Sequence, residues 1–126
     1  MKNEYMRPAS ELSLPVPVGT KSGDAVIIGA LPGVAATDRN AGTAVDTTGN
    51  IPGNASVLLD DRAYIIPVTG AITGPGQAVY IPAAGGALTM TSSGNVLWGY
   101  TIQAADGSYA TKTSGTGPAL VKPAKV

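Results

Sequence analysis

Hydrophobic residues occur along this chain in short runs that are separated by glycine, proline, asparagine and aspartate. Only one interval between successive glycine or proline residues, 54–66, is longer than eight residues. A glycine inside a helix costs about 1 kcal/mol relative to alanine and a proline about 3 kcal/mol, so this spacing disfavours helices throughout. The pattern therefore predicts an all-β chain.

Ten runs rich in β-branched residues are predicted as strands, because turn residues bound each of them. They are 12–18, 25–29, 33–37, 55–59, 63–68, 77–82, 87–91, 96–103, 108–113 and 119–122. Asp106-Gly107 predicts a two-residue type I′ hairpin, since both central residues of that turn need positive φ. Strands at intervals of about 8–12 residues are typical of a small β-sandwich or a β-barrel-like domain.

Three segments do not fit the strand pattern of the expected β domain, 12–113. Residues 1–11 are polar without alternation and are expected to form an extended N-terminal arm. Residues 39–54 form a long loop rich in glycine, threonine and asparagine, and 114–126 are expected to be a hinged C-terminal tail. Such segments suit contacts with neighbouring molecules, although chain ends are also where disorder concentrates.

Composition excludes several kinds of chemistry. The chain has 126 residues, a length typical of one domain, and contains no His and no Cys. An imidazole base, a thiolate nucleophile, a zinc site of the usual kind and a disulfide are therefore absent. Eight Lys and Arg residues balance eight Asp and Glu residues without a basic cluster, which argues against nucleic-acid binding. No apolar run approaches the roughly 20 residues that span a bilayer.

The scarcity of charge also bears on function. Charged residues make up 13% of the chain, against about 25% in an average domain. A surface so poor in charge suggests that another molecule covers part of it. The composition therefore favours a component of an assembly over a freely diffusing enzyme, and we expect no catalytic residue, cofactor or metal.

Two acidic motifs are candidates for a catalytic site. Asp60 and Asp61 could act in acid–base catalysis only if their environments gave the two carboxyl groups different pKa values. A solvent-exposed hairpin tip is the simpler explanation of this pair. Asp46-Thr47-Thr48-Gly49 differs from the Asp-Thr-Gly of aspartic proteases by one extra threonine and lacks the apolar flank. A protease site is therefore rejected.

The segment 96–102 carries the single tryptophan. Strand alternation places Trp98 and Tyr100 on one face, with Gly99 on the other. The two rings would suit a sugar-stacking platform, but they would also supply bulk to a core without phenylalanine. Core packing is the prediction here.

The order of strand and turn segments resembles a known family. The segments are DAVIIG at 24–29, LPGVA at 31–35, GNASV at 53–57, AYIIPV at 63–68, GQAVYI at 76–81 and GNVLWGY at 94–100. Over 11–113 the chain resembles the small capsid cement, or head decoration, proteins of tailed bacteriophages. It departs from the compact pattern of that family in the loop 39–54 and after Ser114.

The resemblance implies a β-rich structural protein with a β-barrel-like domain of the tulip type and without catalysis. It implies a homotrimer, made in the host cytoplasm and bound to the outer surface of the mature head. The trimer would occupy three-fold and quasi-three-fold positions, bridge major capsid protein subunits and stabilise the shell against DNA pressure. Neither nucleic acid nor a membrane is an expected direct partner.

The arm is expected to provide the contact with the capsid or with a neighbouring copy. The expected contact residues are Tyr5, Met6, Arg7, Pro8, Leu12 and Leu14. Two other functions stay open from the residues alone. One is a carbohydrate- or receptor-binding module on the virion that uses Trp98 and the loop 39–54. The other is a small hydrolase that uses Asp60 and Asp61.

Overall fold

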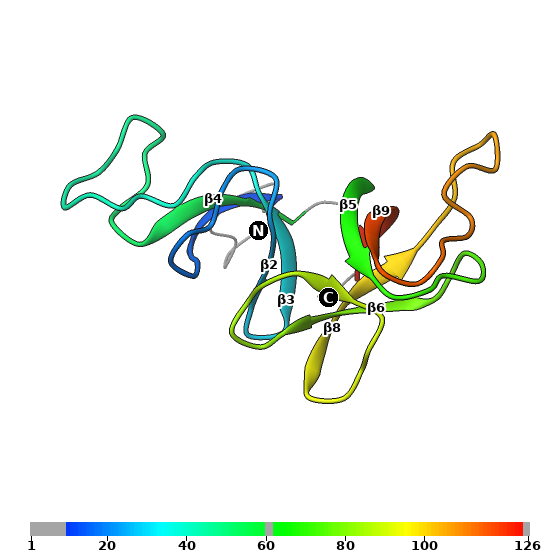
Figure 1. Ribbon diagram of the computed structural model, residues 1–126. Coiled ribbons are helices and arrows are strands. Elements are labelled where there is room, and N and C mark those ends of the chain that lie inside the picture. Colours follow the sequence, from blue (N-terminus) through cyan, green and yellow to red (C-terminus); the bar gives the residue numbers. More distant parts are fainter. Residues whose placement is uncertain (1–9, 60–61, 125–126) are drawn as a thin grey trace, which may run out of the picture.

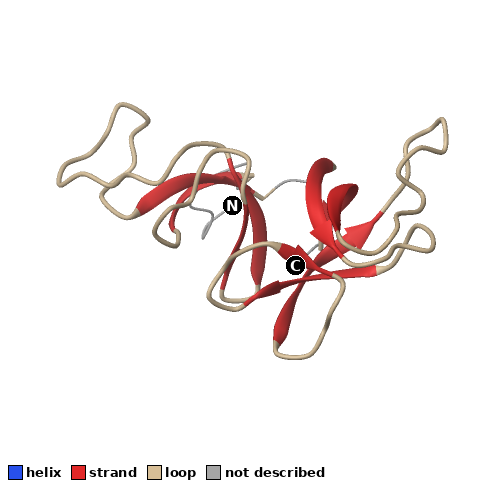
Figure 2. Cartoon of the chain, in the orientation of Figure 1, coloured by secondary structure: helices blue, strands red, loops and turns tan. Residues whose placement is uncertain are grey.

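The computed structural model describes residues 10–59 and 62–124, and this part of the chain contains strands and no helix (Figures 1 and 2). The strands are β1 (Glu11–Pro15), β2 (Ala25–Ile28), β3 (Leu31–Ala35), β4 (Asn54–Leu58), β5 (Tyr64–Thr69), β6 (Ala78–Pro82), β7 (Leu88–Thr89), β8 (Asn95–Thr101) and β9 (Thr116–Pro123). The all-β prediction is confirmed. Over the same residues, no helix is available that could cross a membrane.

The strands form two sheets that follow one another along the chain. The first four build an antiparallel sheet in the order β1-β4-β3-β2. The last five curl into a small barrel in the order β5-β7-β6-β8-β9, in which only β5 and β7 run parallel. Figure 1 shows the sheet on the left and the barrel on the right. The predicted barrel-like architecture therefore describes the second half of the chain.

One hydrophobic core joins the two sheets. Alternation along β5 turns Ile66 and Val68 inward and leaves Ile65 exposed, as expected for a strand with one buried face. The barrel core also takes in Ile27 of β2 and Val34 of β3, which belong to the other sheet. The two halves therefore share buried apolar surface and are not independent modules.

Trp98 makes the most specific contact between the sheets. Its side chain is fully buried, and its indole Nε1 donates to the carbonyl oxygens of Val26 (3.1 Å) and Gly33 (3.2 Å) on β2 and β3. A buried indole N–H needs such a partner, since leaving it unpaired costs free energy. The prediction that Trp98 packs in the core is confirmed.

The predicted alternation of this strand is wrong beyond Trp98. Along β6, Val79 pairs with Gly99 and Tyr80 pairs with Leu97, so Trp98 is an extra residue without a partner there. This β-bulge reverses the faces that follow it, and Tyr100 is exposed while Thr101 is buried. Tyr100 therefore lies on the outer wall of the barrel, not beside Trp98.

The strand predicted at 119–122 within the expected tail is confirmed, but it is longer than predicted and no hinge separates it from the barrel. Residues Thr116–Pro123 form β9, which pairs with β5 on one side and β8 on the other. Ala119 and Val121 point into the barrel and are buried. The physical reason is that closing the barrel requires a strand between β5 and β8, and this segment supplies it.

The predicted strand 108–113 is instead part of a loop. Its only pairing among the described residues is an isolated bridge between Lys112 and Ile72. The preceding turn is not type I′, because Gly107 has a φ of 84° whereas Asp106 is not among the residues with positive φ. The loop is held by the Lys112 ammonium group, which donates to the carbonyl oxygens of Gly70, Thr113 and Gly115.

Candidate functional site

The predicted contact residues of the arm fall into two groups. Tyr5, Met6, Arg7 and Pro8 lie outside the described residues. Leu12 and Leu14 lie on β1 and are half-buried, and Leu14 packs against the core of the first sheet. Leu14 therefore stabilises the sheet, and the role of both leucines in binding a partner stays a prediction.

The strand that follows the arm has one open edge. β1 is the end strand of its sheet, paired only with β4 among the described residues. The Leu59 N–H donates to the Ser10 carbonyl (2.7 Å) and the Val16 N–H to the Gly53 carbonyl (3.2 Å), so the even-numbered residues face β4. The backbone groups of Glu11 and Ser13 therefore point away from β4, where an open edge can accept another strand.

The long loop expected at 39–54 is fixed by buried asparagine side chains. The Asn50 amide group donates to the hydroxyl oxygens of Thr48 (2.8 Å) and Ser56 (3.2 Å), and its Oδ1 accepts from Ser13 (2.5 Å). Asn40 donates to the carbonyl oxygen of Asn50 (2.8 Å). The sequence showed asparagines in this loop but not their burial, because the partners of Asn50 include residues on β1 and β4.

At its outer turn, Asp46 organises the loop. Its carboxylate accepts from the Thr48 N–H (3.0 Å), the Thr48 hydroxyl (2.6 Å) and the Asn50 N–H (3.0 Å). The hydrogen bond from the Thr48 side chain and the others that favour the charged form hold the pKa of Asp46 below its ordinary value. The loop in Figure 1 extends away from the barrel and presents this turn to solvent.

Acidification is expected to release this turn while the two sheets stay folded. A carboxyl whose pKa is lower in the folded state contributes stability above the usual value of about 3.9, and this stability is lost as the pH falls through the folded pKa. An NMR titration should therefore show the amide signals of Thr48 and Asn50 moving together below pH 4 (about the usual pKa). Asp46→Asn is the control and should show no such step. Amide signals of Thr48 and Asn50 that do not shift when Asp46 is protonated would contradict this prediction.

Exposed apolar side chains mark two further surfaces. Val45 and Ile51 are exposed on the long loop. Ile65 and Tyr100 are exposed on the outer wall of the barrel, where Ile65 lies opposite Leu120 on β9. Clustered exposed apolar residues are typical of surfaces that contact other proteins.

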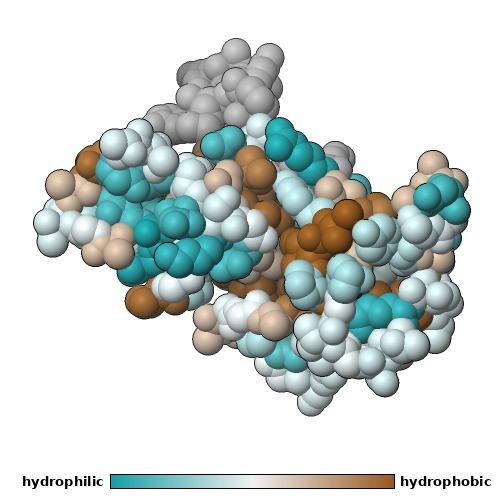
Figure 3. Space-filling view, turned by 45° about the horizontal axis from the view of Figure 1, so that its top comes forward, coloured by the Kyte–Doolittle hydropathy of each residue, from teal (hydrophilic) through white to brown (hydrophobic). Residues whose placement is uncertain are grey.

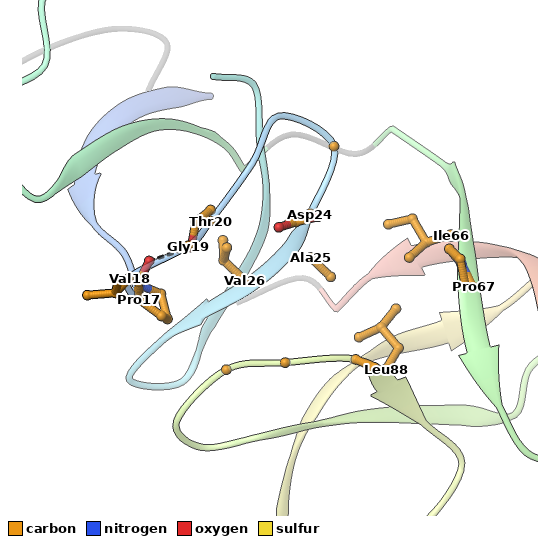
Figure 4. Close-up of a pocket in the computed structure, with 14 residues that line it drawn as sticks. Pro17, Val18, Gly19, Thr20, Asp24, Ala25, Val26, Ile66, Pro67 and Leu88 are labelled. Carbon is orange, nitrogen blue, oxygen red and sulfur yellow. Dashed lines mark hydrogen bonds between the residues drawn. The ribbon is translucent and has the colours of Figure 1, made fainter. Parts of the chain in front are cut away.

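A pocket of about 440 Å³ lies between the two sheets. Its walls include the buried side chains of Val26, Ile66 and Leu88, and Val18 stands on its rim with 85% of its surface exposed. In Figure 3 hydrophobic residues gather where the two halves of the molecule meet. Figure 4 shows Ile66 and Leu88 on the barrel side of the pocket, opposite Ala25 and Val26 of β2.

The polar groups of this pocket are few and do not form a catalytic arrangement. The Thr20 hydroxyl donates to the Pro17 carbonyl (2.7 Å), and the Asp24 carboxylate accepts from the Lys21 N–H (2.9 Å). Both groups stabilise the turn that contains them. The described residues also contain no group of three or more acidic side chains suited to a metal ion.

The sugar-binding alternative loses part of its support, and the hydrolase alternative stays an untested prediction. Trp98 is fully buried, so it does not present its ring to a sugar. Asp60 and Asp61, the carboxylates considered for a hydrolase, lie outside the described residues.

Comparison with known proteins gives one match. No curated protein and no solved structure is significantly similar to the chain. The family model described as phage cement protein matches residues 6–115. This match contains the whole first sheet and the barrel up to the residue before β9. The chain therefore belongs to the phage cement protein family, which implies a structural role in a phage capsid.

Proposed function

We propose that this protein decorates the outside of the expanded phage head as a homotrimer. The trimer bridges neighbouring major capsid protein subunits at three-fold and quasi-three-fold positions of the shell. The observation that carries this proposal is the family match across 6–115. Zero net charge, 13% charged residues and the absence of His and Cys from the sequence support a structural role.

The proposed mechanism is selective binding. A protein that binds only the expanded lattice stabilises that lattice by mass action, by about 2.7 kcal/mol for each site at a free concentration one hundred times Kd. A trimer that touches several capsid subunits binds multivalently, so contacts that are weak alone become long-lived together. Packaged DNA pushes the shell outward, and the bridges oppose the separation of neighbouring subunits.

The surface loops suit this mechanism because they are ordered before binding. Asn40 and Asn50 are buried and hydrogen-bonded, so the long loop already has its shape in the isolated protein. The Lys112 side chain likewise fixes the shape of the loop between β8 and β9, because its ammonium group donates to the Gly70 carbonyl oxygen. Loops that are ordered in advance lose less conformational entropy on binding, which favours affinity.

The decisive experiment adds the purified protein to expanded heads that were assembled without it. We expect the protein to sediment with expanded heads, to stay in solution with unexpanded heads, and to raise the temperature at which heads release DNA. Equal release temperatures with and without bound protein would contradict the proposal. A cryo-microscopy map of the decorated head would then locate the copies relative to the three-fold positions.

Removal of the arm is expected to weaken head binding at least tenfold, because each copy of the trimer loses one contact. The variant lacks residues 1–9 and keeps Ser10, whose carbonyl accepts the hydrogen bond from Leu59. Its melting temperature should match that of the full chain, which separates a binding defect from unfolding. Full occupancy by this variant would exclude the arm from the mechanism.

A further inference from the structure

We propose that the outer face of β5, β9 and β8 binds an apolar, uncharged surface of the major capsid protein. This face, the barrel wall, consists of Ile65 and Pro67 on β5, Pro118 and Leu120 on β9, and Tyr100 on β8. The inference rests on the proposed function, since it assigns the place where each copy contacts a capsid subunit.

Strand pairing places these side chains on one surface. Ile65 lies opposite Leu120, and Pro67 lies opposite Pro118. Residues directly opposite in neighbouring antiparallel strands share a face of the sheet. Tyr100 lies opposite Lys122, two residues beyond Leu120 on the same side of β9. The residues between these positions point into the barrel and are buried; they are Ile66, Ala119, Val121 and Thr101.

β5 and β9 are therefore apolar on both faces. A sheet with one face in water usually places polar residues outward. Here Ile65 is 58% exposed and Tyr100 is 43% exposed. The five barrel strands contain a single ionised side chain, Lys122, at one end of the wall. A hydrogen bond between the hydroxyl groups of Thr69 and Thr116 (2.7 Å) lies at the other end. An exposed apolar patch with polar residues at its rim is typical of a protein contact.

The size of the barrel wall favours a capsid subunit over a second copy as its partner. Three strands about 4.8 Å apart, over about 13 Å of their length, give an area of about 200 Å². A stable pair of proteins buries about 800 Å² on each partner, so two copies that met through this wall alone would separate. A shell engages several copies at once, and small contacts then become long-lived together. Membership of the phage cement protein family supports a capsid subunit as this partner.

The barrel wall also has its shape before binding. Six residue pairs join β5 to β9, so the backbone below the wall is fixed. Pro67 and Pro118 lose no side-chain conformational entropy when they are buried. A charged group of the partner would lose its water against this wall without gaining a hydrogen bond. The partner surface should therefore be apolar and uncharged.

The absence of native cysteine allows the wall to be probed by alkylation. Ile65→Cys places a single thiol on the wall. Ile51→Cys is the matched control, because Ile51 is an isoleucine of similar exposure (54%) on the long loop. A maleimide should modify both thiols at similar rates in the free protein. On expanded heads the rate for Ile65→Cys should fall about tenfold or more, since thiol reactivity requires access.

An Ile65→Cys thiol that reacts equally fast on heads and in the free protein would overturn the proposal. Slow modification of Ile65→Cys in the free protein would overturn it too, because a second copy or the arm would then cover the wall before any capsid is present.

Ile65→Glu tests the apolar character of the contact. Its carboxylate is hydrated in the free protein, so the melting temperature and the mass in solution should stay close to those of the wild type. On the capsid the carboxylate would be buried without a partner, and head binding should fall about a hundredfold or more. Ile51→Glu should bind heads as the wild type does. Equal losses for the two variants, or a lower mass of Ile65→Glu in solution, would overturn the proposal.

Tyr100→Ala is a second variant that keeps the chain folded, since an exposed side chain contributes little to stability. Its head binding should fall severalfold, and full binding would count against the wall. Wild-type binding to heads together with an unprotected Ile65→Cys thiol would refute only this inference. Failure of the wild-type protein to bind heads would refute the proposed function.

Discussion

Replacement of Trp98 by alanine is expected to lower the free energy of unfolding by about 3–5 kcal/mol, the usual range for removal of a large aromatic residue from a core. The Trp98 side chain is fully buried and belongs to the core that joins the two sheets. Its removal leaves a cavity and also removes the N–H donor that bonds to the carbonyls of Val26 and Gly33. Domains of this size have a total stability of only about 5–15 kcal/mol, so the variant should be close to unfolding.

Urea unfolding followed by circular dichroism measures this effect, because the variant lacks the single tryptophan needed for fluorescence. Tyr100→Ala is the matched control: Tyr100 lies two residues further along β8 but is 43% exposed, so its replacement should cost less than about 1 kcal/mol. Equal costs for the two variants would mean that the bulge at Trp98 does not set the faces of β8. Trp98→Phe keeps most of the bulk and isolates the hydrogen bonds, which should be worth about 1 kcal/mol.

Replacement of Gly99 by alanine is expected to destabilise the barrel. A Cβ at this position would overlap the backbone carbonyl of Lys122 on β9, and a backbone group yields less easily than the end of a side chain. Relief of the overlap requires β8 and β9 to separate, at the place where β9 closes the barrel. Overpacking of this kind lowers the free energy of unfolding by about 1–3 kcal/mol. We expect a loss at the upper end of this range for Gly99→Ala, because the overlap is with backbone atoms.

Gly74→Ala is the control for the loss of glycine itself. A Cβ at Gly74 would meet no atom within 4 Å, and the residue is not among the glycines with positive φ. Alanine at this position should change the free energy of unfolding by less than about 1 kcal/mol. Any change should be a small stabilisation, because alanine reduces the conformational entropy of the unfolded chain. Hydrogen exchange gives a second measure, since Gly99→Ala should expose the amides of β9 before those of β4. Uniform exchange across both sheets would contradict a local opening of the barrel.

The fold class follows from local features of the chain. Glycine and proline interrupt nearly every stretch that would be long enough for a helix, and the β-branched runs between them became strands in nine of the predicted places. The burial of Trp98 was predictable for a related reason, since a chain without phenylalanine has few other large side chains for its core. The family resemblance over 11–113 was likewise visible in the order of these segments, and the match to 6–115 confirms it.

The errors arise where distant parts of the chain meet. The tail after Ser114 contains glycine and proline and looks like a hinge by itself, but β5 and β8 leave a place between them that only this strand fills. Tyr100 lies on the opposite face from the predicted one because Trp98 has no partner on β6 and forms a bulge. The alternation of residues within 96–102 does not show this bulge, since it depends on the pairing with another strand.

The sequence by itself determined the class of fold, the positions of most strands, the lack of His and Cys, and the family. Each of these depends on neighbouring residues or on composition. Only the tertiary structure decided the bulge, the closure of the barrel by β9, the buried asparagines and the pocket. These depend on hydrogen bonds and contacts between residues far apart in the chain, and a side chain such as Asn50 is buried or exposed according to which strands surround it.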